Sequence, residues 1–244
     1  MPPAGALIFK LEQTLFRVSL DYGEVLGLVS TAQPGVTGQR STRGLAPAML
    51  ELKKKIGKKA YDRARVKVEA AAERVETRAL DSAQMHPGVV KMLESVRDTG
   101  WWVVAVSDIG RKPVAGFLKS KFLDQYMNLV LARSRLDQER PLAKSLRPVQ
   151  TKLKTLAHSV YFCNSSREVV DAKTLGMKCF VLPSQVEPFR ALYQAGPNGI
   201  ILSLDEIPTL LSLPNMKLPP PTPAVEKPRK GIKKVASGIT PKTP

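Results

Sequence analysis

Short unbroken apolar runs in this chain alternate with stretches in which apolar residues recur every three or four positions. The run Trp101–Val106 is typical of a strand buried on both faces. Before it, residues spaced like one face of a helix precede Gly100, a plausible helix stop. They are Val89, Leu93 and Val96. A further helix is predicted up to Gly176, and a strand over Cys179–Leu182. The 43% hydrophobic content is enough for a sizeable core.

A second helical pattern, over residues 51–79, has a strongly basic outer face. Apolar residues recur there every three or four positions, as on the buried face of an amphipathic helix. They are Leu52, Ile56, Ala60, Ala64, Val68, Ala71, Val75 and Ala79. Between Glu51 and Lys67, eight basic residues stand against two acidic ones. The pattern fits either a solvated face or a surface that binds a polyanion.

The apolar run Ala6–Phe9 leads into the sequence Lys-Leu-Glu-Gln-Thr, residues 10–14. This segment resembles the first motif of haloacid dehalogenase-like (HAD) hydrolases, normally a buried strand ending in Asp-x-Asp-x-Thr. In that family the first Asp attacks phosphorus and helps to bind Mg²⁺, and the second handles the leaving-group proton. Lys10 and Glu12 stand in those places here. An ammonium group can neither form an aspartyl-phosphate nor coordinate Mg²⁺, so the motif implies the fold without the usual chemistry.

Later segments resemble the other HAD motifs, in the family's order. Ser107 stands where a Ser or Thr holds the transferred phosphate. Arg140, which precedes a proline, resembles the lysine that neutralises nucleophile and phosphate, and Lys144 is a second candidate. No catalytic residue is expected from these degenerate positions.

The fourth motif is also altered. Asn164 and Glu168 stand where the family has two metal-binding acids, and Cys163 replaces the usual glycine. With Lys10, the charge at the three metal-site positions falls from about −3 to 0, which removes most of the attraction for Mg²⁺. We therefore expect no metal and no cofactor, with Mg²⁺ required only if the protein is an active phosphatase.

The resemblance implies an α/β fold, with a Rossmann-like HAD core, a parallel sheet and a helical cap inserted between the first and second motifs. We expect the core in residues 1–16 and 86–213 and the cap in residues 17–85. Residues 214–244, rich in Pro and Lys, are expected to form a disordered basic tail.

Lys10 has two interpretations. It could be an anion clamp, with Ser107, Arg140 and the N-terminus of the helix after Ser165 completing a phosphate site. It could instead form an ion pair inside the emptied pocket. The candidate partners are Glu12, Asp108 and Glu168. We expect the ion pair, because a buried charge without a partner costs several kcal/mol.

The sequence contains no other group of residues that is typical of a catalytic site. His86 and His158 have no Ser/His/Asp context. Cys163 and Cys179 fall in predicted core strands and lack zinc or disulfide spacing. They indicate reduced, buried thiols of an intracellular protein, and no secretory signal is visible. The compartment stays open between cytoplasm, nucleus and organelle.

The charge balance points to the partner. The chain has 38 Lys and Arg against 21 Asp and Glu, a net charge of +17 and a pI near 10.0. This favours a polyanion, with RNA or a ribonucleoprotein leading and an acidic protein surface as an alternative. No apolar span predicts membrane insertion. The predicted polyanion-binding residues are Lys53, Lys54, Lys55, Lys58, Lys59, Arg63, Lys227, Arg229, Lys230, Lys233 and Lys234.

Together these features predict a catalytically inactive HAD-like protein that acts as a basic scaffold or binding subunit in an RNA-containing or other large assembly. The main alternative is an active phosphomonoesterase in which Glu12 or Asp108 replaces the missing Asp. A third possibility is a sensor that binds phosphate or a nucleotide without turnover.

Overall fold

The computed structural model describes residues 5–38, 42–97, 99–138, 140–184, 187–213 and 216, without the side chains of residues 42–44. The tail residues predicted to bind a polyanion lie outside this part. They are Lys227, Arg229, Lys230, Lys233 and Lys234.

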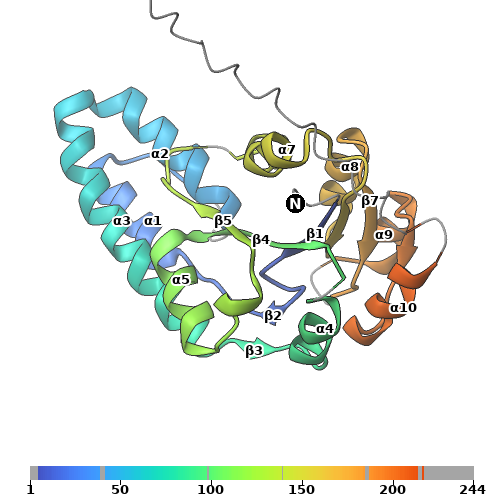
Figure 1. Cartoon of the computed structure of the whole chain (residues 1–244). Coiled ribbons are helices and arrows are strands. Elements are labelled where there is room, and N and C mark those ends of the chain that lie inside the picture. Colours follow the sequence, from blue (N-terminus) through green and yellow to red (C-terminus); the bar gives the residue numbers. More distant parts are fainter. Residues whose placement is uncertain are drawn as a thin grey trace, which may run out of the picture.

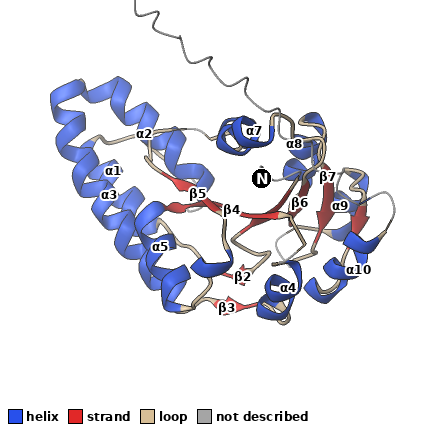
Figure 2. Ribbon diagram, viewed as in Figure 1, coloured by secondary structure: helices blue, strands red, loops and turns tan. Residues whose placement is uncertain are grey.

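A six-stranded sheet with only parallel pairs forms the centre of the molecule, in the order β5-β4-β1-β6-β7-β8 (Figures 1 and 2). Its strands are β1 (Ala6–Lys10), β4 (Trp102–Gly110), β5 (Leu129–Arg133), β6 (Val160–Cys163), β7 (Lys178–Val181) and β8 (Gly199–Ile200). β1 lies between β4 and β6 and is buried along its whole length. The predicted α/β class with a parallel sheet is confirmed.

Helices cover both faces of the sheet. One face is covered by α4 (Val89–Val96), α5 (Arg111–Ser120) and α10 (Ile207–Ser212). The other is covered by α6 (Leu142–Ser145), α7 (Arg147–Leu153), α8 (Ser166–Thr174) and α9 (Phe189–Gln194). Two short 3₁₀ turns are η1 (Asp124–Tyr126) and η2 (Leu204–Glu206). None of the helices in the described ranges combines the length and apolar character needed to cross a membrane.

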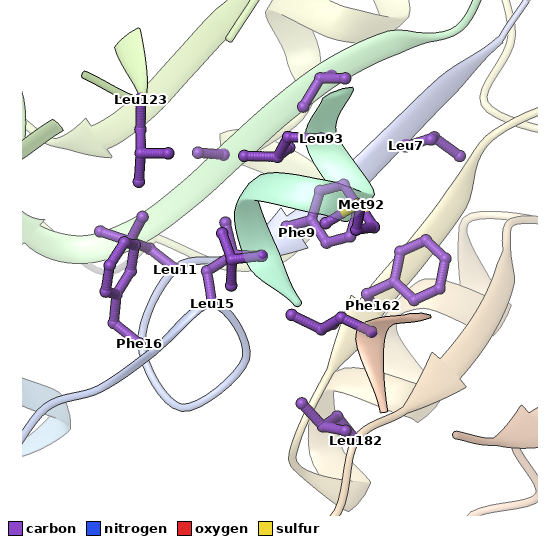
Figure 3. Packing of buried hydrophobic residues seen from close by; sticks show 14 of the residues in the cluster. Leu7, Phe9, Leu11, Leu15, Phe16, Met92, Leu93, Leu123, Phe162 and Leu182 are labelled. Carbon is purple, nitrogen blue, oxygen red and sulfur yellow. The ribbon is translucent and has the colours of Figure 1, made fainter. Parts of the chain in front are cut away.

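Alternate residues of β1 enter the two apolar layers, as the period of a strand requires. Leu7 and Phe9 face the layer of α4, whereas Ile8 faces that of α8. The Phe9 ring stacks on Phe162 of β6, with centroids 4.8 Å apart (Figure 3). This packing fixes the end of β1 that leads into the candidate site.

Three helices form a separate pile beside α5 (Figure 1). They are α1 (Gly23–Ala32), α2 (Thr42–Ile56) and α3 (Lys58–Asp81). They share an apolar cluster of their own, which includes Val25, Leu52 and Val68. The chain enters and leaves the pile through a small antiparallel ribbon, β2 (Phe16–Arg17) with β3 (Gln84–Met85). The exact division into core, cap and tail remains a prediction.

The basic pattern over residues 51–79 is two helices rather than the single helix that periodicity predicts. Gly57 separates α2 from α3 and has φ +71°, a left-handed conformation that glycine adopts without a steric penalty. Apolar spacing cannot reveal the break, because both helices bury their stripes in the same cluster, Leu52 from one and Val68 from the other.

Candidate functional site

The candidate site lies where the carboxyl ends of three strands of the sheet meet, as sites in open α/β sheets do. Lys10 ends β1 and is paired in register with Val106 of β4. Asp108 follows along β4, and Glu168 comes from α8, just after β6. The sheet thus brings together residues that are about 100 and 160 positions apart in sequence.

Lys10 is surrounded by carboxylates. Its Nζ lies 2.5 Å from Asp108 Oδ2, 3.5 Å from Glu12 Oε2 and 3.6 Å from Glu168 Oε1. The Lys10 side chain is 9% exposed, whereas that of Asp108 is 39% exposed. The predicted ion pair of Lys10 is confirmed, with all three of the candidate partners.

The carboxylates hold Lys10 in its charged form. Burial alone would lower the pKa of Lys10, but the three carboxylates, Glu12 first, outweigh burial and raise that pKa well above its ordinary 10.5. Burial raises the pKa of Glu12, against the opposing effect of the Lys10 charge. Lys10 is therefore a fixed cation rather than a nucleophile or a proton donor.

The Glu12 carboxylate fills a cradle of donors at the end of β4. Its Oε1 accepts hydrogen bonds from Ser107 Oγ at 2.5 Å, Asp108 N at 3.0 Å and Ile109 N at 3.1 Å. Its Oε2 is buried without a hydrogen bond and lies 3.5 Å from Lys10 Nζ. The Ser107 hydroxyl, which the resemblance assigns to phosphate, donates to a carboxylate of the chain itself.

Hydrogen-bonding groups at the N-terminus of α8 are likewise bound by side chains of the chain itself. Ser165 Oγ accepts from Glu168 N at 3.4 Å and donates to Glu168 Oε2 at 2.9 Å. Ser166 N donates to Glu187 Oε2 at 2.9 Å, and the Ser166 hydroxyl donates to the same carboxylate. Three components of the anion clamp, Lys10, Ser107 and this helix end, are therefore already bound to carboxylates of the chain.

A cavity of about 300 Å³ opens beside Lys10. Leu45, Ala46 and Pro47 of α2 form one wall. Arg140 lines the cavity, and burial lowers its pKa against the opposing effect of Asp108. Lys144 is exposed on α6 and is not part of the lining. Of the two candidates for the family lysine, Arg140 is thus the one that lines the cavity.

The residues do not fit the Mg²⁺ that the resemblance implies. The Lys10 ammonium already lies among the carboxylates that a metal would need. Asn164 donates its amide to Ser184 Oγ at 3.3 Å. In the described part of the chain, no three His, Cys, Asp or Glu side chains are grouped to hold a metal ion.

The two cysteines are free and buried, as predicted. Their sulfur atoms lie 3.6 Å apart on β6 and β7. The contact with Cys179, together with burial, raises the pKa of Cys163 far above its ordinary value, so Cys163 is not a reactive thiolate. Neither His86 nor His158 lines the cavity.

Sequence reasoning missed the buried carboxylate of Glu76, which joins the helical pile to the sheet. Glu76 is 1% exposed and belongs to α3. It accepts hydrogen bonds from Tyr22 Oη at 2.7 Å and from Gly110 N at 2.9 Å. It also pairs with Arg133, which ends β5 and donates from Nε to Asp108 O at 2.8 Å. We call Glu76, Tyr22, Gly110 and Arg133 the Glu76 clasp.

A signal for the clasp exists in the sequence. Glu76 lies four residues after Ala72 and three before Ala79, so it falls on the buried stripe of α3. A carboxylate in that position requires a buried partner. The partner, Arg133, could not be named from the sequence because it lies on another element, 57 positions away.

The predicted basic residues within the described ranges gather around the turn between α2 and α3, and all are exposed. They are Lys53, Lys54, Lys55, Lys58, Lys59 and Arg63. They lie on the helical pile and do not line the cavity beside Lys10.

Solved structures share the fold. A predicted phosphatase from Clostridium acetobutylicum has a TM-score of 0.61 at 16% identity, over 86% of this chain and 99% of that one. A haloacid dehalogenase-like family protein from Streptococcus pneumoniae scores 0.58 at 12% identity, over 85% and 98%. An HAD phosphatase from Thermococcus onnurineus scores 0.53 at 19%, over 85% and 98%. No curated protein sequence matches the chain.

The family comparison agrees with the fold. The model of haloacid dehalogenase-like hydrolases matches residues 39–182, more than half of the chain. The match includes Ser107, Arg140, Asn164 and Glu168, but it begins after the strand that carries Lys10. By sequence as well as fold, the chain belongs to the haloacid dehalogenase-like hydrolase family.

Proposed function

We propose that this protein carries out no phosphoryl transfer and serves as a basic scaffold or binding subunit in an assembly that contains RNA or another polyanion. One observation carries the first half of the proposal. The ammonium of Lys10, the residue that the resemblance aligns with the family nucleophile, pairs with Asp108, Glu12 and Glu168.

The chemistry of the family explains why this matters. Phosphoryl transfer of this kind needs a carboxylate that attacks phosphorus and a divalent metal that offsets phosphate charge. Lys10 supplies neither, and its charge opposes a metal ion. The Glu12 carboxylate also takes the donors of Ser107, Asp108 and Ile109, which an incoming phosphate would need. The cation and the hydrogen-bond donors that would bind a phosphate are therefore already engaged by carboxylates of the chain itself.

The alternative is an active phosphomonoesterase, and two observations favour it. The similar structures include proteins described as phosphatases. Asp108 is also the most exposed carboxylate of the site and lines the cavity. Against this, Asp108 Oδ2 accepts a charge-assisted hydrogen bond from the Lys10 ammonium at 2.5 Å. This bond makes the Asp108 carboxylate a weaker nucleophile.

The proposed absence of phosphoryl transfer is tested by measuring turnover of a generic phosphomonoester with Mg²⁺ present. We expect background rates for the parent protein and for Lys10→Asp, since Asn164 would still lack the metal carboxylate. Turnover that is lost in Glu12→Gln or Asp108→Asn would overturn the proposal in favour of the phosphatase. Turnover that survives in both variants and stays with the protein through repurification would also overturn the proposal.

The proposed role in an assembly that contains a polyanion is tested by identifying what co-purifies with the full chain, with and without nuclease treatment. We expect associated RNA and partners that nuclease releases. A nuclease-resistant association would place the contact with a protein and would contradict the polyanion part of the proposal.

A further inference from the structure

The outer end of the helical pile carries a run of exposed cations that make no ion pair with any described residue. This end is the turn from α2 to α3, far from the sheet (upper left in Figure 1). Among residues 53–67, three cations pair internally. The pairs are Lys53 with Asp137 at 3.8 Å, Lys55 with Glu51 at 2.7 Å and Arg65 with Glu69 at 3.0 Å.

The other five cations of this segment are exposed and make no ion pair with any described residue. They are Lys54, Lys58, Lys59, Arg63 and Lys67, and we call them the unpaired basic surface. The single acid within the segment, Asp62, is set against five such cations, and the ion pair that it forms is with Arg65, at 4.0 Å. The excess positive charge is therefore uncompensated where it is most accessible.

The rest of α3 has the opposite character. Arg74 and Arg78 pair with Glu24 at 3.3 and 3.0 Å, and Glu73 pairs with Lys112 at 3.4 Å. Charge is thus balanced along the C-terminal half of α3, which pairs with α1 and α5, and unbalanced along the N-terminal half, next to the turn from α2. A generally basic composition would not separate the two halves of one helix in this way.

Helix stability does not explain the arrangement. Lys59, Arg63 and Lys67 follow one another at intervals of four, so they share one face at steps of about 6 Å. Like charges at this spacing repel, and cations in the first turn of α3, where Lys58 and Lys59 lie without an acid, oppose the helix dipole. An external anion would relieve both costs.

We propose that the unpaired basic surface binds the phosphate backbone of a nucleic acid strand; this rests on the proposed function and names its contact surface. Protein interfaces are depleted in Lys and enriched in aromatic residues. Here Tyr61 is buried, and Val66, 62% exposed, is the single large apolar side chain exposed among residues 53–67. A membrane surface would need an exposed apolar face, whereas Val68 and Ala71 are packed inside the pile.

The number of cations in the unpaired basic surface sets the expected salt dependence of binding. If each one neutralises a phosphate, they contribute up to about −3.5 to the slope of log K against log salt on a single strand, and about −4.5 on a duplex. Such binding positions a protein on a backbone without reading bases, so it should tolerate changes in sequence.

The test compares two variants of the full chain that lose the same charge. One changes Lys54, Lys58, Lys59, Arg63 and Lys67 to Gln. The matched control changes five paired cations, Arg65, Arg74, Arg78, Lys112 and Arg135, to Gln. Affinity for a fluorescent single-stranded RNA is measured from low to moderate salt, with DNA of the same sequence and polyglutamate as parallel probes.

We expect the first variant to flatten the salt slope by about 3 units and the control by less than about 1. Equal affinity for RNA and DNA supports backbone recognition, and a preference for RNA supports it with added contacts to the sugar. Equal losses in the two variants would show that binding follows net charge alone and would overturn the proposal. So would absence of RNA binding by the parent, or tighter binding of polyglutamate than of RNA.

A second measurement needs no variant and covers the case in which a variant fails to fold. Acetylation of the parent with and without RNA should show protection of Lys54, Lys58, Lys59 and Lys67, but not of Lys112. Protection of Lys112 to the same extent would contradict a localised surface. The proposed lack of phosphatase activity is unaffected by either result, because it is tested by turnover.

Discussion

Lys10 Nζ lies 2.5 Å from Asp108 Oδ2, across the carboxyl ends of the adjacent strands β1 and β4. The pair is held from both sides, because the same ammonium also contacts Glu12 and Glu168. A buried cation with three carboxylates nearby is bound more tightly than an isolated pair at the surface, where solvent screens the charges. Its removal should therefore lower the stability of the fold.

Replacing Lys10 with Asp should destabilise the fold by about 3–5 kcal/mol, because a fourth carboxylate would join three that have lost their cation. Lys10→Met should cost less, since it removes the cation without adding a like charge. Urea unfolding monitored by circular dichroism measures both. Unchanged unfolding of Lys10→Asp would mean that Lys10 is solvated and would revive its interpretation as an anion clamp.

Replacing Glu12 with Ala should convert the cradle at the end of β4 into an anion site. The donors of Ser107, Asp108 and Ile109 would lose the carboxylate that they share, while Lys10 stays nearby. Inorganic phosphate should then raise the melting temperature of Glu12→Ala more than that of the parent. Glu12→Gln is the matched control, because its amide oxygen still accepts from the cradle. A similar phosphate effect on all three proteins would locate the phosphate elsewhere.

The Glu76 clasp predicts coupling between two neighbouring positions. A Cβ on Gly110 would lie 2.8 Å from Glu76 Oε2, although the backbone of Gly110, with φ −60°, suits any residue. Gly110→Ala should therefore cost about 1–3 kcal/mol in the parent and clearly less in a Glu76→Ala background. Unfolding free energies of the four proteins give the coupling. Additive losses would show that the backbone of Gly110, rather than Glu76, resists the methyl group.

Asp137 should make stability depend on acid pH. Burial would raise its pKa, but two 2.8 Å hydrogen bonds from Arg135 outweigh burial, so the pKa of Asp137 falls below its ordinary 3.8. A carboxyl with a lowered folded-state pKa stabilises the fold above the ordinary value, and this contribution is lost as the pH falls below it.

The measurement compares the parent with Asp137→Asn. The difference in unfolding free energy should be full at neutral pH and should shrink as the pH falls below the ordinary pKa of 3.8. A difference that stays constant over this range would mean that Asp137 contributes by packing rather than by its charge.

The sequence allows the core of the fold to be predicted because its strands are continuous apolar runs, such as Trp101–Val106, that end in recognisable polar motifs. The pairing of Lys10 is also predictable, since a charge at the end of a buried strand needs a partner. Which carboxylate comes closest is not, because Glu12, Asp108 and Glu168 all lie within reach and the choice depends on backbone geometry that no local pattern encodes.

The features that could not be predicted depend on contacts between distant elements or on one backbone angle. The helix break depends on the positive φ of Gly57, and a glycine in a helical pattern usually signals only a small cost. The acid that meets Ser166 is Glu187, 21 positions later and beyond another strand. The Glu76 clasp joins elements whose relative placement appears only after the whole domain has folded.

The position of β1 has a consequence for how this protein is made. The first strand synthesised lies in the middle of the sheet, and its neighbours β4 and β6 begin at Trp102 and Val160. At about 5–20 residues per second, β1 waits several seconds for β4 and longer for β6. During that time, five residues that are buried in the finished protein are left without a partner strand. Contacts between segments so distant in sequence slow folding, and they leave the apolar side chains of β1 exposed to aggregation until its neighbours arrive.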